Sequence, residues 1–255
     1  YEVLSGLVGS EMCIRDRYYR LKLATKNIGV LYLLIEDGEL QQIPVDVKYY
    51  SFSVDTLNEL NYEPIEESII PGSNHFPVLQ FYKEHPEFLY YWNIEYDVYF
   101  NGKWESFFDP FEMIISDFIS SHIEWYTQRP KWDWWKSVQF KTLSIPQNRY
   151  LKSFNPIYRI SNRALKALDG VLSLRNSGHH EVVIPTVLDY LGYTINDFGG
   201  NSEFTLCELN IPCYLSNSEL NNWYTESTMR YRPVFNKEAI TRKGIDNMLY
   251  HPIKF

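Results

Sequence analysis

The sequence predicts an α/β fold in which helices flank a mixed, mainly parallel sheet. Three observations predict this class. Val30–Ile35 is a continuous apolar run of the kind that forms a strand buried on both faces. Leu89–Phe100 is rich in aromatic and β-branched residues and ends at Asn101-Gly102, which is typical of a strand followed by a turn. Helix-like segments separate the strands, and such an alternation favours a parallel sheet covered by helices.

Local signals predict the elements of the first half in order. Gly29 ends the helix that precedes the apolar run, and Asp55 is a suitable N-cap for a short helix. Pro86 ends a longer helix, and apolar residues at helical spacing up to Trp125 predict another. The expected helices are Tyr18–Asn27, Asp55–Leu60, Phe76–His85 and Met113–Trp125, and the expected strands are Val30–Ile35, Val47–Val54 and Leu89–Phe100.

Two further helices are expected in the second half, at Ser161–Leu168 and Pro185–Leu191. The first begins at a serine suited to capping it, and Gly192 follows the second. After Gly199 the chain is rich in loop-forming residues. No repeat, low-complexity tract or linker divides the chain, so we expect residues 18–255 to form a single domain.

The first seventeen residues stand apart from this pattern. They show no helical stripe, no strand alternation and no cap, and their charges follow the short apolar segment, unlike those of a signal peptide. Glu11–Arg17 resembles the translation of a sequencing adaptor of the transposon-insertion kind, as in a metagenomic fragment. We therefore expect residues 1–17 to be foreign to the protein; a genuine polar N-terminus is the alternative.

Composition and charge narrow the function. The chain has 24 Lys plus Arg against 32 Asp plus Glu, so its net charge is −8 and its pI about 5.3. This balance argues against a nucleic-acid-binding protein, which needs a basic face. No apolar run is long enough for a transmembrane segment. Aromatic residues make up 17 %, which suits either a rich core or a sugar-facing cleft.

Cysteine usage predicts a reducing compartment. Outside the first seventeen residues only Cys207 and Cys213 occur, and their spacing fits neither a redox motif nor a zinc knuckle. Two cysteines make no disulfide framework, so we expect a cytoplasmic protein, with peripheral attachment to the inner face of the membrane left open. A single bridge between the two cysteines is the alternative.

The predicted strand Leu89–Phe100 carries polar side chains on one face. Side chains alternate along a strand, so Asn93, Glu95 and Asp97 share a face, with the two carboxylates about 7 Å apart. Carboxylates among apolar residues are costly to desolvate without a partner, and Mg²⁺ or Mn²⁺ would balance their charge. Open α/β folds also bind ligands at the carboxyl ends of their strands. The alternative is an edge strand whose polar face points to water.

This segment resembles the metal-binding acidic motif of glycosyltransferases with the GT-A fold, in which two acidic residues flank one other residue. Glu95-Tyr96-Asp97 matches the motif with Glu in place of the usual first Asp. Further blocks between residues 71 and 254 resemble a little-characterised bacterial glycosyltransferase family. They are Tyr90–Val98, Gly102–Trp104, Phe107-Phe108, Asn155–Leu165, Gly178–Thr186, Asp197–Gly200 and Leu249–Lys254.

The resemblance implies transfer of a hexosyl or N-acetylhexosaminyl group from a nucleotide-sugar donor to a glycan or another hydroxyl acceptor, for example in surface polysaccharide synthesis. Asp97, helped by Glu95, would hold Mn²⁺ or Mg²⁺ on the donor diphosphate. His251 stands where the fold often supplies a further metal ligand, and Lys254 would pair with a phosphate oxygen. The alternative for His251 is a histidine that only packs against its neighbours, and the alternative for Lys254 is a solvated lysine.

The resemblance also implies a catalytic base. Glu181 lies where inverting members of the fold place the carboxylate that deprotonates the acceptor hydroxyl. This chain departs from the family motif, because Val182 stands where the motif has Asp. The alternative is that Glu181 only stabilises the N-terminus of the following helix, where the helix dipole favours a carboxylate. His180 would orient Glu181 or contact the acceptor.

Donor and acceptor contacts are expected from two other regions. Asn74 and His75 precede the helix before the acidic strand, a region that often touches the nucleotide in this fold; an ordinary turn and cap is the alternative. Trp104 and the tryptophans of Trp132–Trp135 would stack on sugar rings, although large aromatic side chains are more common in cores.

A GT-A-like sheet opens with a strand whose following loop contacts the nucleotide base. Tyr18–Asn27 matches the helix after that strand, so we expect the first strand to be missing. Two other functions stay open. A glycoside hydrolase would use Glu95 and Asp97 as an acid/base pair, whereas in a non-catalytic carbohydrate-binding protein the tryptophans would matter and the carboxylates would not.

Overall fold

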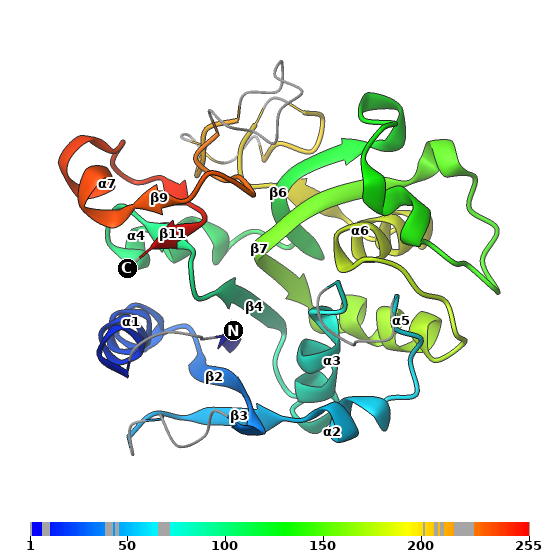
Figure 1. Cartoon of the computed structure of the whole chain (residues 1–255), viewed down its shortest axis with the longest axis horizontal. Coiled ribbons are helices and arrows are strands. Elements are labelled where there is room, and N and C mark those ends of the chain that lie inside the picture. The colour runs from blue at the N-terminus through cyan, green and yellow to red at the C-terminus, as the bar shows by residue number, and fades with distance from the viewer. Residues whose placement is uncertain are drawn as a thin grey trace.

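The computed structural model describes residues 2–6, 11–38, 43, 46–65, 72–200, 202–206, 209, 212–216 and 227–254, with the backbone alone for 2–6 and 11–15. A seven-stranded sheet in the order β3-β2-β1-β4-β7-β6-β8 forms the centre of this part of the chain (Figure 1). Its strands are β1 (Glu2–Gly6), β2 (Val30–Glu36), β3 (Tyr49–Phe52), β4 (Tyr90–Glu95), β6 (Phe118–Trp125), β7 (Leu151–Ser161) and β8 (Ile195–Asp197).

The sheet is mixed and mainly parallel, which confirms the predicted fold class. Strands β3, β2, β1 and β4 run parallel to one another, and β8 is parallel to β6. Strand β7 runs antiparallel to both β4 and β6. The carboxyl ends of β1, β2 and β4 therefore meet at one edge, which is where open α/β sheets bind ligands.

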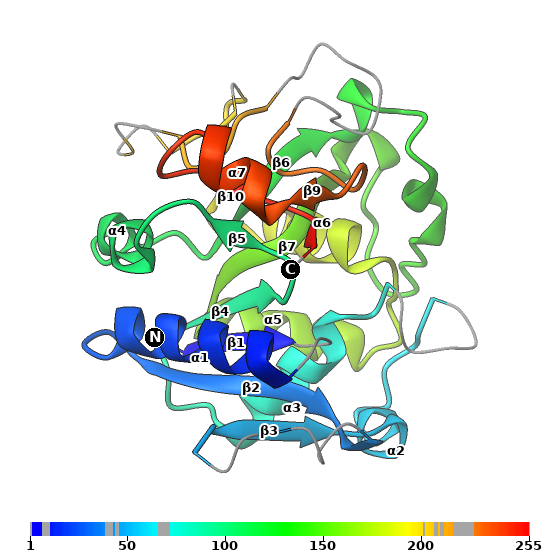
Figure 2. The same cartoon turned by 60° about the vertical axis from the view of Figure 1, so that its left-hand side comes forward.

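Helices cover both faces of the sheet, as the two views show (Figures 1 and 2). Helices α1 and α4 share one apolar cluster with Trp92, whereas α3, α5 and α6 share another with Tyr91. Neighbouring residues of β4 thus face opposite cores, which explains why that strand is apolar on both sides. The helices are α1 (Glu11–Thr25), α2 (Val54–Asn58), α3 (His75–Glu84), α4 (Trp104–Phe108), α5 (Asn162–Leu172), α6 (His180–Tyr190) and α7 (Lys237–Lys243).

A strand occupies the position that we expected to be empty. Strand β1 lies between β2 and β4, with Leu4 opposite Tyr32 on one side and Asn93 on the other. Its backbone completes two hydrogen-bond ladders that would otherwise be open edges inside the sheet. The expectation of a missing first strand is corrected accordingly. The adaptor-like origin of residues 1–17 stays a prediction.

One predicted helix is a strand. The helix expected over Met113–Trp125 is wrong, because Phe118–Trp125 forms β6 and pairs with β7 and β8. Residues four apart, such as Phe118 and His122, lie on one side of either a helix or a strand, so a short apolar pattern does not separate the two. Ile115 is 82 % exposed, which a helical stripe facing the core would not allow.

The predicted strand Leu89–Phe100 is two strands joined by a turn. Strand β4 ends at Glu95, Tyr96 and Asp97 form the turn, and β5 follows. Glu95 and Asp97 therefore do not share one strand face. The remaining strands are β5 (Tyr99–Phe100), which pairs antiparallel with β10 (Leu249–Tyr250), and β9 (Phe235–Asn236), which pairs with β11 (Ile253–Lys254).

Two helix starts differ from the prediction. Helix α2 is capped by Ser53, whose Oγ accepts from Thr56 N at 3.2 Å, and not by Asp55. Helix α6 begins at His180, so Glu181 belongs to its first turn and Pro185 lies inside it. None of the helices in the described ranges has both the length and the apolar character needed to cross a membrane.

Candidate functional site

Three side chains from two distant parts of the chain meet at the carboxyl end of β4. Glu95 is the last residue of β4, Asp97 lies in the following turn, and His251 lies between β10 and β11. His251 Nε2 is 3.2 Å from Asp97 Oδ1 and 3.8 Å from Glu95 Oε2. One possible ligand atom from each residue lies within 4.8 Å of the others. The fold thus brings together the three residues predicted as metal ligands, and we refer to them below as the trio.

Backbone pairing holds the trio in place. Tyr99 of β5 lies opposite Tyr250 of β10, and Ile253 N donates to Asp97 O at 2.9 Å. His251 Nδ1 lies 2.8 Å from Arg230 O. Because a carbonyl oxygen only accepts, Nδ1 carries the proton, and Nε2 is the ring nitrogen that faces the carboxylates, as in many metal-binding histidines.

The donor set fits a divalent cation. Burial raises the pKa of Glu95; the charge of Asp97 adds to the rise, and His251 and a hydrogen bond from Asn74 oppose it. Burial alone would lower the pKa of His251, but its contacts with the two carboxylates raise it. The contact of His251 with Asp97 lacks regular hydrogen-bond geometry, so Asp97 Oδ1 accepts no hydrogen bond within the described ranges. Two carboxylates and one imidazole nitrogen suit Mn²⁺, whereas Mg²⁺ prefers oxygen ligands.

Glu181 belongs to the same site as the trio. Its Oε1 accepts a hydrogen bond from Asn155 N at 3.4 Å. Asn155 follows Phe154, whose ring centroid lies 5.2 Å from that of His251. Burial raises the pKa of Glu181 to about 7, and the charge of Glu95 contributes to the rise. The predicted base therefore lies near enough to the trio for the charge of Glu95 to raise its pKa.

Contacts from distant segments position Glu181. His179 Nδ1 accepts from Glu181 N at 3.3 Å and lies 3.7 Å from Glu181 Oε2. Pro185 has no N–H to donate to Glu181 O, and Ser153 Oγ donates to that carbonyl at 3.5 Å. The indole of Trp134 stacks on His179 at 4.3 Å and 24°. The sequence pattern did not indicate Ser153, because its partner lies 28 residues along the chain, nor did it indicate the stacking of Trp134 on His179.

The segment before α3 packs against the start of α6. His180 N donates to Gly72 O at 2.9 Å, and the stacked rings of His75 and His180 have centroids 6.4 Å apart. Asn74 Nδ2 donates to Glu95 Oε1 at 3.5 Å. The two residues predicted to contact the donor thus lie between the trio and the predicted base.

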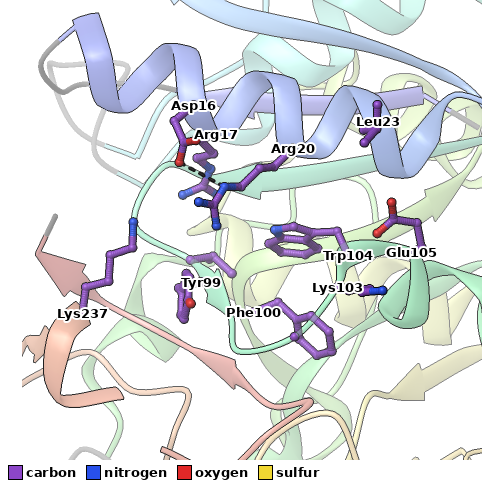
Figure 3. Close-up of a pocket in the computed structure, with 12 residues that line it drawn as sticks. Asp16, Arg17, Arg20, Leu23, Tyr99, Phe100, Lys103, Trp104, Glu105 and Lys237 are labelled. Atoms are coloured by element: carbon purple, nitrogen blue, oxygen red, sulfur yellow. Dashed lines mark ion pairs between the residues drawn. The ribbon is translucent and has the colours of Figure 1, made fainter. Parts of the chain in front are cut away.

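A pocket of about 740 Å³ lies beside the turn that carries Asp97 (Figure 3). Figure 3 shows Arg17 and Arg20 reaching from α1 towards Tyr99. The Arg17 guanidinium donates to the carbonyls of Glu95, at 2.7 Å, and of Tyr96. Burial lowers the pKa of Arg17 to about 10. The pocket is lined by Asp16, Arg17, Arg20, Leu23, Val98, Tyr99, Phe100, Gly102, Lys103, Trp104, Glu105 and Lys237.

The last two predicted site residues are Trp104, in the wall of this pocket, and Lys254, on β11. Trp104 lines the pocket, and its largely buried ring packs on Phe100 and Phe108. Lys254 is exposed on β11, directly after Ile253, whose amide binds the Asp97 carbonyl.

The chain matches no protein-family model and no curated protein. Among solved structures it is similar to a galactosyltransferase, LgtC, in complex with donor and acceptor sugar analogues (7 % identity, TM-score 0.44, 77 % of this chain and 73 % of that one). It is also similar to the inositol-1-phosphate CTP transferase from T. maritima (9 %, 0.41, 82 % and 91 %). A third is a glycosyltransferase involved in glycosylation of the major capsid of PBCV-1 (15 %, 0.38, 77 % and 80 %). At such low identities and TM-scores, function has to be argued from the site.

Proposed function

We propose that the chain is a metal-dependent glycosyltransferase that moves a sugar from a nucleotide-sugar donor to a glycan or another hydroxyl acceptor. The observation that carries this proposal is the meeting of the trio at the carboxyl end of β4, with Glu181 in the same site. A cation-binding trio beside a carboxylate of raised pKa suits a reaction in which a diphosphate leaves while a hydroxyl is deprotonated.

Asp97, Glu95 and His251 would hold Mn²⁺ or Mg²⁺ through two carboxylate oxygens and one imidazole nitrogen. When bound, the cation supplies neutralisation of the diphosphate charge, which makes the nucleoside diphosphate a better leaving group. The chain's own part is to fix the three donor atoms. The hydrogen bond from His251 Nδ1 to Arg230 O aims Nε2, and the turn after β4 holds the carboxylates.

Glu181 is the proposed base. The acceptor hydroxyl gives its proton to the Glu181 carboxylate as its oxygen bonds to the anomeric carbon of the sugar. The bond from that carbon to the phosphate oxygen breaks, and its electron pair leaves with the nucleoside diphosphate. A pKa of about 7 suits this base, because the carboxylate is ionised in part at neutral pH and still has a high affinity for the proton.

The other predicted contacts complete the proposal. Asn74 and His75 would contact the donor, and Asn74 already donates to a trio carboxylate. Lys254 would reach a donor phosphate from β11. His180 and Trp104 are the proposed acceptor contacts, His180 from beside the base and Trp104 from the pocket wall.

A glycoside hydrolase is the second candidate function, and the geometry of the trio argues against it. Such an enzyme places the sugar between its acid and its second carboxylate. In this site His251 contacts both Glu95 and Asp97, a contact that suits a shared cation better than an intervening sugar ring. A carbohydrate-binding protein would not need the carboxylates at all.

Thermal unfolding with UDP or GDP, each with and without Mn²⁺, tests the proposal. A ligand at about 100 times its Kd stabilises the native state by about 2.7 kcal/mol, which raises the Tm by roughly 5–10 °C. We expect a rise that needs both metal and nucleotide and that vanishes in Asp97→Asn. The matched control Asp109→Asn changes an exposed carboxylate and should behave as wild type. A rise without Mn²⁺, or no rise with either nucleotide, would contradict the proposal.

A further inference from the structure

Four side chains of two neighbouring segments carry buried polar atoms that have no hydrogen-bond partner within the described ranges. The atoms are Ser73 Oγ, Asn74 Oδ1, both ring nitrogens of His75, and Ser177 Oγ. Ser73 and Ser177 are each 1 % exposed and His75 is 3 % exposed. Buried polar atoms are nearly always paired, so a concentration of unpaired ones points to a ligand that pairs with them when bound.

These atoms belong to two segments that touch, Gly72–His75 and Ser177–His180. Gly72 O accepts from His180 N at 2.9 Å, and a Cβ added to Gly72 would come within 3.2 Å of the His179 ring. The first segment reaches the trio through Asn74, and the second continues into Glu181. The unpaired atoms are therefore carried by the two segments that connect the residues proposed to hold the diphosphate with the proposed base. The anomeric carbon of the donor has to lie in that interval.

The chemistry of the unpaired atoms fits hydroxyl groups. A serine hydroxyl donates and accepts, an amide oxygen accepts, and a neutral imidazole offers one donor and one acceptor. Burial lowers the pKa of His75 to about 3 and that of His179 to about 4, and it lowers the pKa of His180 well below the ordinary value. The imidazoles in this interval are thus uncharged at neutral pH.

The charged groups around the interval disfavour an anionic ring. Glu95 and Glu181 bound it, and both are carboxylates. Lys152, which lowers the pKa of Glu181, is engaged elsewhere, since its Nζ lies 3.4 Å from Glu124 Oε2 and donates to His122 O at 3.3 Å. A carboxylate on the ring would thus lie beside two acidic side chains, and Lys152, the cation that acts on Glu181, is already paired with Glu124.

We propose that Ser73, Asn74, His75 and Ser177 form the subsite for the transferred sugar, and that this subsite selects a neutral, hydroxyl-rich ring over one that carries a carboxylate. This inference rests on the proposed function. It adds the class of sugar, and it assigns His75 to the sugar ring and not to the nucleotide.

Isothermal titration in the presence of Mn²⁺ tests it with two series of probes: UDP, UDP-glucose and UDP-glucuronic acid, and GDP, GDP-mannose and GDP-mannuronic acid. We expect the wild type to bind one neutral sugar nucleotide at least tenfold more tightly than its uronic acid counterpart. In His75→Phe, which keeps a ring against Phe76 and His180, that sugar nucleotide should bind at least tenfold more weakly. The nucleoside diphosphate alone should keep its Kd within twofold. Equal binding of the neutral and acidic probes, or an equal loss for diphosphate and sugar nucleotide, would overturn the inference.

Ser177→Ala gives a second test that does not depend on the folding of His75→Phe. Removing a buried hydroxyl without a partner should raise the Tm of the free protein and weaken binding of the neutral sugar nucleotide several-fold. Ser106→Ala, at an exposed serine of α4, is the matched control and should leave that binding unchanged. A lower Tm, or a higher Tm with unchanged binding, would overturn the assignment of Ser177. If neither UDP nor GDP binds, the proposed function itself is wrong. If one of them binds in a way that depends on Asp97, but the neutral and acidic sugar nucleotides do not differ as expected, only this inference is wrong.

Discussion

Replacing Glu181 with glutamine removes the charge of this side chain and keeps its shape. Burial raises the pKa of Glu181 to about 7 from an ordinary value of 4.5, so the folded protein holds the proton more tightly than the unfolded chain. The resulting stabilisation is full below the unfolded pKa and is lost as the pH rises through 7. A difference of about 2.5 pH units corresponds to about 3 kcal/mol in the free energy of unfolding.

We therefore expect Glu181→Gln to be as stable as the wild type near pH 4.5 and more stable by up to about 3 kcal/mol at pH 8. In Tm this amounts to roughly 6–12 °C at pH 8. Transfer to the acceptor should fall by about 10²–10⁴-fold, because the proposed base is lost. The gain in stability and the loss of activity come from the same buried carboxylate.

Urea denaturation at pH 5, 6, 7 and 8 measures the first effect, and single-turnover transfer at pH 8 measures the second. Glu59→Gln, at an exposed glutamate that ends α2, is the matched control and should follow the wild type at every pH. A Glu181→Gln curve parallel to the wild type from pH 5 to 8 would refute the electrostatic reasoning. Near-normal transfer would remove Glu181 as the base.

Three further predictions concern the metal, the core and the acceptor. Chelation should abolish transfer, and added Mn²⁺ should restore it. In isothermal titration, His251→Gln should bind Mn²⁺ about 10–100-fold more weakly than the wild type. An unchanged affinity for Mn²⁺ would exclude His251 as a ligand. Arg159→Met should cost about 3 kcal/mol or more in urea denaturation, because the buried guanidinium donates to three main-chain carbonyls; a loss under about 1 kcal/mol would contradict this. Trp134→Leu should raise the KM for the acceptor up to about tenfold and leave the affinity for the donor unchanged, because the indole stacks on His179 beside the proposed base. A change in the KM for the donor alone would argue against an acceptor role of Trp134.

Local signals were enough for the elements whose pattern is complete within a few residues. The apolar run Val30–Ile35 forms β2, and Ser161 caps α5 by accepting from Ala164 N at 3.2 Å. Strand β7 was not predicted, because its polar residues have partners far along the chain. Asn155 is 1 % exposed and bonds to Ser120 Oγ and to the His180 carbonyl. Such a strand lacks the alternation that identifies a half-buried one.

The candidate site was predictable in part for a similar reason. The Glu95–Asp97 spacing is visible in the sequence, and a turn brings the two carboxylates to one histidine, where a strand had been expected. Arg17 was set aside with residues 1–17, yet it donates to the carbonyls on which that turn is built. Ser177 gave no signal at all, since an unpaired buried hydroxyl is recognised only in three dimensions.

The pairing of β5 with β10 has a consequence for how the protein folds. Asp97 and His251 are about 150 residues apart in the sequence, so their meeting requires closure of a very long loop. Such a contact costs more loop-closure entropy than the contacts within a helix. If the trio holds a cation as proposed, cation binding would report on the docking of β10 against β5.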